Sequence, residues 1–206
     1  MSYVNGNVKV NGTGLFSENN HKTACPSWSI SPSFCAGKKG TICAHCYAQK
    51  GNYLYPVVKN GIQKRGTWFT KCPDNIVTGT MIRLIQKQKI KYIRVFESGD
   101  FSSIKDIEKW YKIASSCPEH KFWIPTRTWH KKDFLPYLQK LNGLKNVVVR
   151  PSSLDFDKKA PIIKGLAAGT TAYTKKAQDG HIDCPGSCEN CRVCWGSTEK
   201  ITYHYH

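Results

Sequence analysis

The fold is decided by residues 91–151, KYIRVFESGDFSSIKDIEKWYKIASSCPEHKFWIPTRTWHKKDFLPYLQKLNGLKNVVVRP. Apolar runs at 91–98, 121–126 and 146–151 have the composition of buried strands. Before each run, apolar residues recur at the spacing of one helix face: Val77, Met81, Leu84 and Ile85; Ile104, Ile107, Tyr111 and Ala114; Phe134, Leu135, Leu138 and Leu141. Three such helix–strand repeats predict an α/β fold, built on a parallel sheet or on a partial (β/α) barrel.

Two of these helices have recognisable start sequences. Pro73 and Asp74 open the first, and Ser103 with Asp106 resembles a capping box ahead of the second. Such side chains accept hydrogen bonds from the backbone N–H groups that a first helical turn leaves unpaired. We therefore expect helices to begin near residues 73 and 103.

Polar side chains follow each predicted strand. Sites in parallel α/β folds lie at the carboxyl ends of the strands, so we expect the three ends to converge. The candidate catalytic residues are Asp100, Arg127 and Asp155, and the candidate cofactor-binding residues are Ser98, Gly99, Asp100, Arg127 and Ser152. For Asp100 an alternative stays open, in which its carboxylate caps the helix that begins near Ser103.

Four cysteines lie close together near the carboxyl end, in CPGSCENCRVCWG at 184–196. They are Cys184, Cys188, Cys191 and Cys194. Short spacings let one segment aim several sulfurs at one centre, whereas disulfides that close such short loops stabilise little. Because no long spacer separates two cysteine pairs, a 4Fe–4S cluster is favoured over zinc, and a structural zinc site is the alternative.

A second cysteine group lies near the amino end, within residues 24–51. It comprises Cys25, Cys35, Cys43 and Cys46. Cys43 and Cys46 form a tight pair, while Cys25 and Cys35 are either further metal ligands or buried thiols. Whether the two groups form one metal centre or two is open. Cys72 and Cys117, each followed by proline, are expected to pack in the core or in loops.

The length of 206 residues, with 40% hydrophobic side chains, suits one substantial core. We expect a single domain over 1–206, with an N-terminal cysteine-containing segment at 1–54, a βα core at 55–172 and a C-terminal cysteine cluster at 173–206. No run of eighteen apolar residues is present, and residues 1–14 lack the apolar core of a signal peptide. These features predict no membrane partner and a reducing cytoplasm, where thiols bind metals more readily than they form disulfides.

The chain is strongly basic, with 31 Lys and Arg against 14 Asp and Glu and a net charge of +17. Such a charge is self-repelling unless a polyanion neutralises it, and nucleic acid, either DNA or RNA, is the natural partner. Residues 50–71, KGNYLYPVVKNGIQKRGTWFTK, combine basic and aromatic side chains that suit phosphate contact and base stacking. The alternatives are a surface that is merely rich in lysine and a helix with an aromatic core face.

The order of these motifs resembles the phage gene product 88 domain family. The resemblance rests on CAHCYAQKG (43–51), SGDF (98–101), TRTW (126–129), PSSLD (151–155) and CRVCW (191–195). It implies a protein of phage or mobile-element origin that acts in the host cytoplasm. It does not supply a reaction.

The layout is also similar to that of radical S-adenosylmethionine enzymes, which carry a cysteine loop after the first strand of a partial barrel. This similarity implies that Cys35, Cys43 and Cys46 bind an iron–sulfur cluster with one iron open to the cofactor. The spacing is C-x7-C-x2-C, where that superfamily has C-x3-C-x2-C. The expected function is modification of a nucleobase or a nucleotide-derived substrate.

The same similarity implies roles for the strand ends. The segment from Ser98 to Asp100 would contact the amino group of S-adenosylmethionine, and Arg127 would meet its carboxylate. Ser152 or Asp155 would contact its ribose. These assignments make the carboxyl edge of the sheet a cofactor site.

Two other functions remain open. ESGDF at 97–101 is similar to the base-recognising strand end of guanine transglycosylases, which carry a structural zinc and exchange a base for a 7-deazaguanine. In that case Asp100 or Asp155 would be the nucleophile. In the other, the protein is a metal-stabilised nucleic-acid-binding protein without catalysis.

Overall fold

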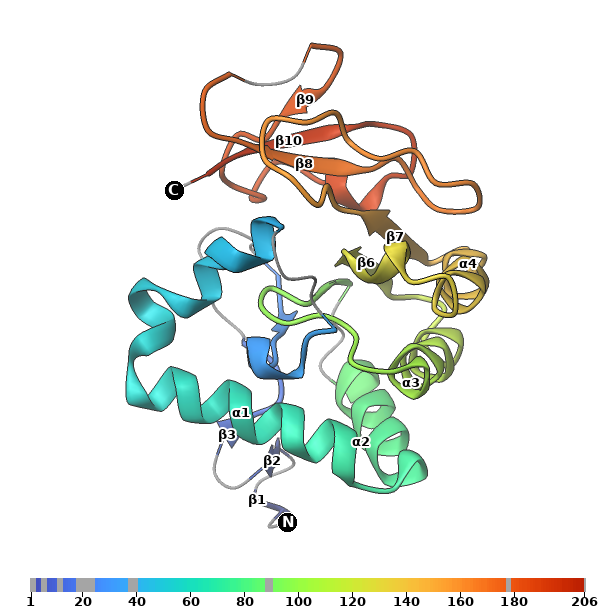
Figure 1. Ribbon diagram of the computed structural model, residues 1–206. Coiled ribbons are helices and arrows are strands. Elements are labelled where there is room, and N and C mark those ends of the chain that lie inside the picture. Colours follow the sequence, from blue (N-terminus) through green and yellow to red (C-terminus); the bar gives the residue numbers. More distant parts are fainter. Residues whose placement is uncertain are drawn as a thin grey trace.

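The computed structural model describes residues 3–4, 7–10, 13–17, 25–36, 41–87, 91–176 and 179–205 (Figure 1). The α-helices are α1 (Pro56–Lys71), α2 (Asp74–Lys87), α3 (Ile104–Ser115) and α4 (Leu135–Asn142). The strands are β1 (Tyr3–Val4), β2 (Asn7–Val10), β3 (Thr13–Gly14), β4 (Ser27–Trp28), β5 (Tyr92–Val95), β6 (Lys121–Thr126), β7 (Val147–Pro151), β8 (Thr170–Tyr173), β9 (Ile182–Asp183) and β10 (Ile201–His204). Short 3-10 helices are η1 (Pro32–Phe34), η2 (Ile42–His45), η3 (Tyr47–Gln49), η4 (Gly51–Leu54), η5 (Thr128–His130) and η6 (Val193–Trp195).

A parallel four-stranded sheet lies at the centre of the molecule, in the order β4-β5-β6-β7. Its last three strands fall within the apolar runs at 91–98, 121–126 and 146–151, and α2, α3 and α4 fall on the predicted helical stretches. The predicted α/β class with a parallel sheet is therefore confirmed. All four strands point the same way, so their carboxyl ends meet at one edge.

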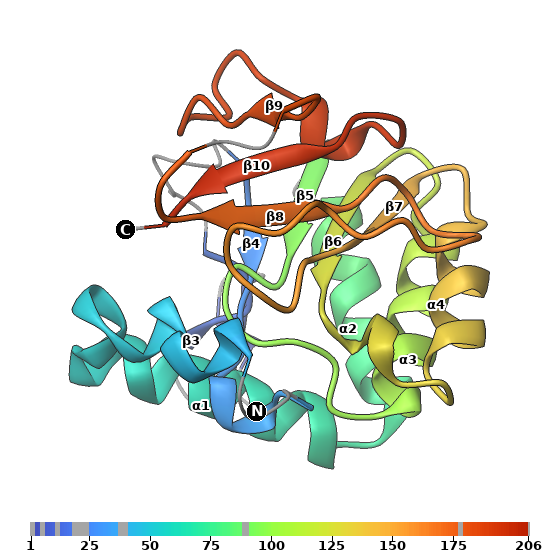
Figure 2. The same cartoon turned by 45° about the horizontal axis from the view of Figure 1, so that its top comes forward.

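One face of this sheet is covered by helices, and Figure 2 shows α2, α3 and α4 along that side. Strands β5 and β6 alternate their side chains between the two faces, as the pleat of a strand requires. Ile93 and Phe122 join the large core that the helices share, whereas Tyr92 and Trp123 pack in a second cluster on the opposite face. A strand buried on both faces explains the nearly continuous apolar runs.

The second face is covered by a C-terminal lobe, whose sheet has the order β8-β10-β9 with all strands parallel (Figure 2). A parallel bridge between Ser152 and Thr170 connects this lobe to the end of β7. The described strands form this sheet, the four-stranded sheet and an antiparallel β1-β2-β3 sheet. The partial barrel therefore stays a prediction.

Arg150, on β7, joins the lobe to the central sheet. Its guanidinium donates to the backbone carbonyls of the lobe segment and of the connection into β8: Cys194 at 3.0 Å, Ala168 at 2.7 Å, Glu199 at 2.6 Å, Val193 at 3.0 Å and Gly196 at 2.5 Å. A guanidinium has five N–H donors, so each donor has a carbonyl acceptor. Although Arg150 is 0% exposed, its polar hydrogens are satisfied.

The predicted capping box of α3 is present in part. The hydroxyl of Ser103 accepts a hydrogen bond from the backbone N–H of Asp106, as expected of an N-cap. The Asp106 carboxylate, however, accepts from the backbone and the hydroxyl of Ser102, one residue earlier than a capping box requires. The chain entering α3 is thus held by two side chains of its first turn.

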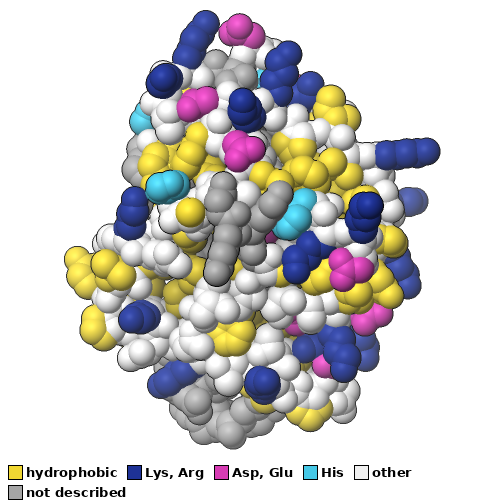
Figure 3. All heavy atoms as spheres, viewed as in Figure 1, with side chains coloured by type: hydrophobic (Ala, Val, Ile, Leu, Met, Phe, Trp, Pro, Cys, Tyr) yellow, Lys and Arg dark blue, Asp and Glu magenta, His cyan; other side chains and the backbone are white. Residues whose placement is uncertain are grey.

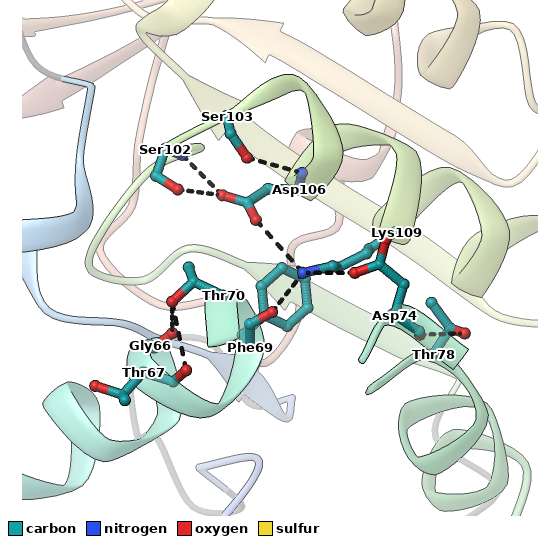
Figure 4. A network of polar contacts seen from close by, with 10 residues as sticks. All are labelled: Gly66, Thr67, Phe69, Thr70, Asp74, Thr78, Ser102, Ser103, Asp106 and Lys109. Carbon is teal, nitrogen blue, oxygen red and sulfur yellow. Dashed lines mark hydrogen bonds and ion pairs between the residues drawn. The ribbon is translucent and has the colours of Figure 1, made fainter. Parts of the chain in front are cut away.

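A buried ammonium ties α3 to α1 and α2 (Figure 4). Lys109 Nζ donates to the carbonyl of Phe69 at 2.6 Å, and it lies 3.2 Å from a carboxylate oxygen of Asp74 and 4.0 Å from one of Asp106. Its side chain is only 4% exposed. Removing one partner of a buried ion pair leaves the other charge uncompensated, which costs more than the pair contributes.

We therefore expect Lys109→Ala to lower the free energy of unfolding by about 3 kcal/mol. The matched control is Lys105→Ala, because Lys105 is exposed on the same helix. Urea denaturation of the control should stay within about 0.5 kcal/mol of the parent. Equal stability of the two variants would show that the buried network does not stabilise the junction of the helices.

Candidate metal and cofactor site

The carboxyl edge of the central sheet is assembled by hydrogen bonds between neighbouring strand ends. The backbone N–H of Ile30, beyond β4, donates to the carbonyl of Ser98 at 3.1 Å, and the Ser98 hydroxyl donates to the Ile30 carbonyl at 3.0 Å. The backbone N–H of Ser152 donates to the carbonyl of Thr126 at 2.8 Å. The hydroxyl of Ser152 accepts from that of Thr170 at 3.0 Å. Ser98 and Ser152 are thus both buried and bonded within the protein.

The turn after β5 adopts an unusual backbone conformation. Phe96 has a φ of 64° and Gly99 a φ of 90°. A side chain at position 99 would run into Ile30, whose carbonyl oxygen would lie 2.9 Å from the added Cβ. Glycine is required here because the end of β4 approaches this backbone so closely. Strained non-glycine residues such as Phe96 gather at functional sites.

Asp100 bridges the ends of β5 and β6. One carboxylate oxygen accepts from the backbone N–H of Phe101 at 2.8 Å and from the Thr126 hydroxyl at 2.7 Å, and the other accepts from the backbone N–H of Arg127 at 2.8 Å. Burial raises the pKa of this carboxyl, and the hydrogen bonds oppose that shift without cancelling it. The carboxylate does not cap α3 at Ser103. Its two oxygens instead accept hydrogen bonds from residues at the ends of β5 and β6.

Arg127 lies next to this carboxylate. Its Nε donates to the carbonyl of Ser153 at 3.0 Å, and its own carbonyl lies 2.6 Å from Nδ1 of His130. The pKa of the Cys35 and Cys46 thiols is raised by burial, and the positive charge of this guanidinium offsets a small part of that rise. Arg127 therefore stands between the strand ends and the N-terminal cysteine loop.

Three N-terminal cysteines, Cys35, Cys43 and Cys46, influence one another electrostatically near this edge. The pKa of the Cys35 thiol is raised by burial first, and then by the negative charges of Asp100, Cys46 and Cys43. Burial likewise raises the pKa of Cys46, and Cys43 adds to that rise. The charges of these groups therefore act on one another across this part of the edge.

The described residues around the N-terminal cysteines are attached to the ends of two strands. The backbone N–H of Ala36 donates to the carbonyl of Phe101 at 3.3 Å, and that of Ile42 donates to Leu154 at 2.8 Å. Farther along, the Tyr47 hydroxyl donates to the carbonyl of Glu97. The loop is thus bonded to the ends of β5 and β7, so its sulfurs are delivered by the fold.

The remaining candidates are placed less centrally. Asp155 is exposed, and its hydrogen bonds with the Ser153 hydroxyl use its backbone groups. The structure thus brings Ser98, Gly99, Asp100 and Arg127 to the edge with the three cysteines, while Ser152 is engaged with β8. The catalytic role of Asp155 stays a prediction.

The C-terminal cysteines lie on the other face of the sheet. Cys194 packs in the cluster formed with Trp123, and Cys184 and Cys188 pack against it. Cys25 belongs to the same cluster, although the sequence groups it with Cys35. Cys72 and Cys117 pack with the helix-side core, as expected.

Arg94 is a site residue that sequence reasoning missed. Its guanidinium lies 4.8 Å from the ring centre of Trp123, and its charge acts on Tyr47 and Glu97 on one side and on Cys188 on the other. Within the described chain, its buried Nε has no hydrogen-bond acceptor. Because successive side chains of a strand point to opposite faces, the run KYIRVFES predicts that Arg94 faces away from Ile93 and Val95. Nothing in the sequence indicates which residues cover it.

Among the residues that the structure describes, no three His, Cys, Asp or Glu side chains are arranged so that they could hold a metal ion. The donor chemistry nevertheless fits a thiophilic metal, because thiolates are the ligands of zinc and of iron–sulfur clusters. A bound cation would also reverse the raised pKa of Cys35 and Cys46 by favouring their thiolate forms. None of the helices that the structure describes is long and apolar enough to span a membrane.

Comparison with known proteins identifies a family. The family model described as Gene product 88 matches residues 6–183. No curated protein and no solved structure matches the chain. The matched range contains the carboxyl edge and Cys35, Cys43 and Cys46, and it ends directly before Cys184.

Asp100→Asn should lower the free energy of unfolding by about 1–3 kcal/mol, because an amide nitrogen replaces one oxygen that accepts from a backbone N–H. Asp155→Asn is the matched control at the same edge, since its side chain is exposed. Thermal and urea unfolding of both variants would measure the difference. If Asp100→Asn is as stable as its control, the carboxylate is not a clamp between the strands.

Proposed function

The chain belongs to the phage gene product 88 family, and we propose that it is an iron–sulfur enzyme, similar to radical S-adenosylmethionine enzymes, that modifies a nucleobase or a nucleotide-derived substrate. One observation carries the proposal. The charges of Asp100, Cys46, Cys43 and Arg127 all act on the Cys35 thiol, near the carboxyl edge of a parallel sheet. Ligand sites in open α/β folds lie at this edge.

The three thiols would hold a 4Fe–4S cluster with one iron free of protein ligands. Such a cluster supplies the electron that cleaves S-adenosylmethionine and so starts radical chemistry. The wide spacing between Cys35 and Cys43 is compatible with this ligand set, because hydrogen bonds from Ala36 and Ile42 hold the loop against two strand ends. Folding, rather than one tight turn, brings the sulfurs together.

Arg127 and Asp100 have different roles in the proposal. The Arg127 guanidinium supplies N–H donors of the geometry that binds a carboxylate, such as that of the methionine moiety. Asp100 holds the backbone N–H of Arg127 and the Thr126 hydroxyl, so it positions the arginine.

A nucleic acid is the substrate class that the surface favours. Beside the cysteine loop, η3, η4 and the start of α1 expose Tyr47, Leu54, Tyr55 and Val57, at 46%, 59%, 60% and 76% of their surfaces. Figure 3 shows hydrophobic side chains gathered at the left of the molecule with Lys and Arg around them. With a net charge of +17, this surface suits stacking on bases and contact with phosphates.

The transglycosylase alternative needs a carboxylate free to attack a sugar carbon. The carboxylate of Asp100 already accepts three hydrogen bonds at the strand ends, so neither oxygen is free to attack. A purely binding function leaves the convergence of three thiols with Arg127 unexplained. We therefore favour the iron–sulfur enzyme over both.

The activity is tested by reconstituting the full chain anaerobically with iron and sulfide, then adding dithionite and S-adenosylmethionine. The parent should release 5′-deoxyadenosine and methionine, and Cys43→Ser should release neither, because it removes a cluster ligand. Cys72→Ser is the control and should retain activity, since Cys72 packs with the helix-side core.

Arg127→Lys separates binding from cluster assembly. It should keep its iron content and lose at least about tenfold in affinity for S-adenosylmethionine, because lysine lacks the planar fork. Equilibrium dialysis measures that affinity. A parent that binds iron and sulfide but never cleaves S-adenosylmethionine would contradict the proposal.

Nucleic-acid binding should depend steeply on salt, with a log–log slope on the order of −4 for several neutralised phosphates. Tyr55→Ala combined with Lys59→Gln should weaken binding to a single-stranded oligonucleotide, by about 1–3 kcal/mol for the lost stacking. Tyr137→Ala combined with Lys140→Gln is the matched control on α4. Equal affinities of the two double variants in fluorescence anisotropy would exclude the proposed surface.

A further inference from the structure

We propose that the C-terminal lobe holds a second metal centre, bound by the four thiolates of Cys25, Cys184, Cys188 and Cys194 and not by the four adjacent C-terminal cysteines alone. Its metal is thiophilic, either zinc or an iron–sulfur cluster. The centre lies on the face of the sheet opposite the helices. Its existence does not depend on the chemistry proposed for the N-terminal loop.

Packing brings these four residues together. Cys25 and Cys194 are 5% and 6% exposed and belong to one apolar cluster, against which Cys184 and Cys188 also pack. Cys191 is half-buried and does not pack in this apolar cluster, although its charge acts on Cys188. The sequence spacing alone would have included Cys191 and left out Cys25.

Three separate pieces of backbone deliver the thiols. Cys25 precedes β4 and is placed beside β5, because the carbonyl of Pro26 accepts from the backbone N–H of Arg94 at 3.1 Å. Cys184 follows β9, and its own backbone N–H donates to Thr202 of β10 at 2.9 Å. Cys194 lies in η6. A ligand set drawn from three elements is defined only in the folded chain.

Aromatic rings and a hydroxyl group lie beside these thiols. The rings of Trp123 and Trp195 meet edge to face at 5.2 Å between centroids, and both belong to the same cluster. The Tyr203 hydroxyl lies 3.4 Å from Sγ of Cys194, at hydrogen-bonding distance. Second-shell donors of this kind orient metal ligands and tune the metal.

The buried Arg150 and the half-buried Arg94, on the two strands β7 and β5, bring positive charge to the lobe's side of the sheet that a thiolate centre would balance. Arg150 is fully buried, and its donors meet backbone carbonyls rather than a carboxylate. Arg94 has a buried Nε without an acceptor in the described chain, and its charge acts on Cys188. A metal bound by four thiolates is anionic as a whole. Buried cations require such compensation.

The test uses the full chain in a Cys43→Ser/Cys46→Ser background, which removes the N-terminal centre. Iron, sulfide and zinc are measured per chain after anaerobic purification, and absorbance near 400 nm distinguishes an iron–sulfur cluster from zinc. The background protein should retain a metal. Adding Cys25→Ser or Cys194→Ser should abolish that metal, whereas Cys191→Ser and the core control Cys72→Ser should keep it.

A second measurement uses the unmutated chain, so it gives a result even if the variants fail to fold. In the unmutated chain, alkylation followed by mass spectrometry should find Cys25 and Cys184 protected until a chelator removes the metal. Cys191 should react with or without the chelator, and the buried Cys117 should stay protected in both conditions.

Metal retained after Cys25→Ser, metal lost after Cys191→Ser, or Cys25 labelling that ignores the chelator would each overturn the proposed ligand set. None of these outcomes bears on cleavage of S-adenosylmethionine, which is measured in the unmutated background. The second metal centre and the proposed enzyme activity can therefore be confirmed or contradicted independently of each other.

Discussion

The guanidinium of Arg150 sits fully buried between β7 and the C-terminal lobe, and backbone carbonyls accept all of its donors. A lysine could reach neither the number nor the spread of these acceptors, because its ammonium is a compact point charge. Burial lowers the pKa of Arg150, yet guanidinium remains protonated at any ordinary pH. The lobe is thus attached to the sheet by a permanent charge in a dry interface.

The C-terminal lobe covers the face of the central sheet that the helices leave open. With Trp123 buried and Tyr92 partly buried under the lobe, the sheet is covered on both sides. The candidate site residues lie at the carboxyl edge, where Asp100 joins two strand ends and Gly99 lets a third approach. Rigid strand ends are better platforms for a cysteine loop than a flexible surface would be.

The sequence predicted the parts of the fold that carry a regular period. Helix α3 and strand β6 follow from their apolar spacing, and the N-cap of Ser103 is confirmed. The C-terminal lobe could not be predicted from the sequence. Strand β9 has only two residues and therefore no periodicity, and tertiary contacts decide which strand it pairs with. Cys25 was grouped with its neighbours in the chain, but its position is set by where β4 enters the sheet. The sequence correctly predicts that Asp100 lies at the carboxyl edge of the sheet. Its three hydrogen bonds could not be predicted, because they depend on how neighbouring strands align, and no local sequence pattern determines that alignment.

The strand order of the lobe has a consequence for how the protein is made. Strand β10 lies between β8 and β9, although it follows both of them in the chain. While a ribosome is still adding β10, the other two strands have no common neighbour to pair with, and the carbonyl of Glu199 has only just become available to Arg150. Domains form as units once their residues have emerged. The helix-covered sheet can therefore fold early in synthesis, whereas the C-terminal thiols stay exposed to solvent and oxidants until the central strand of their lobe has been translated.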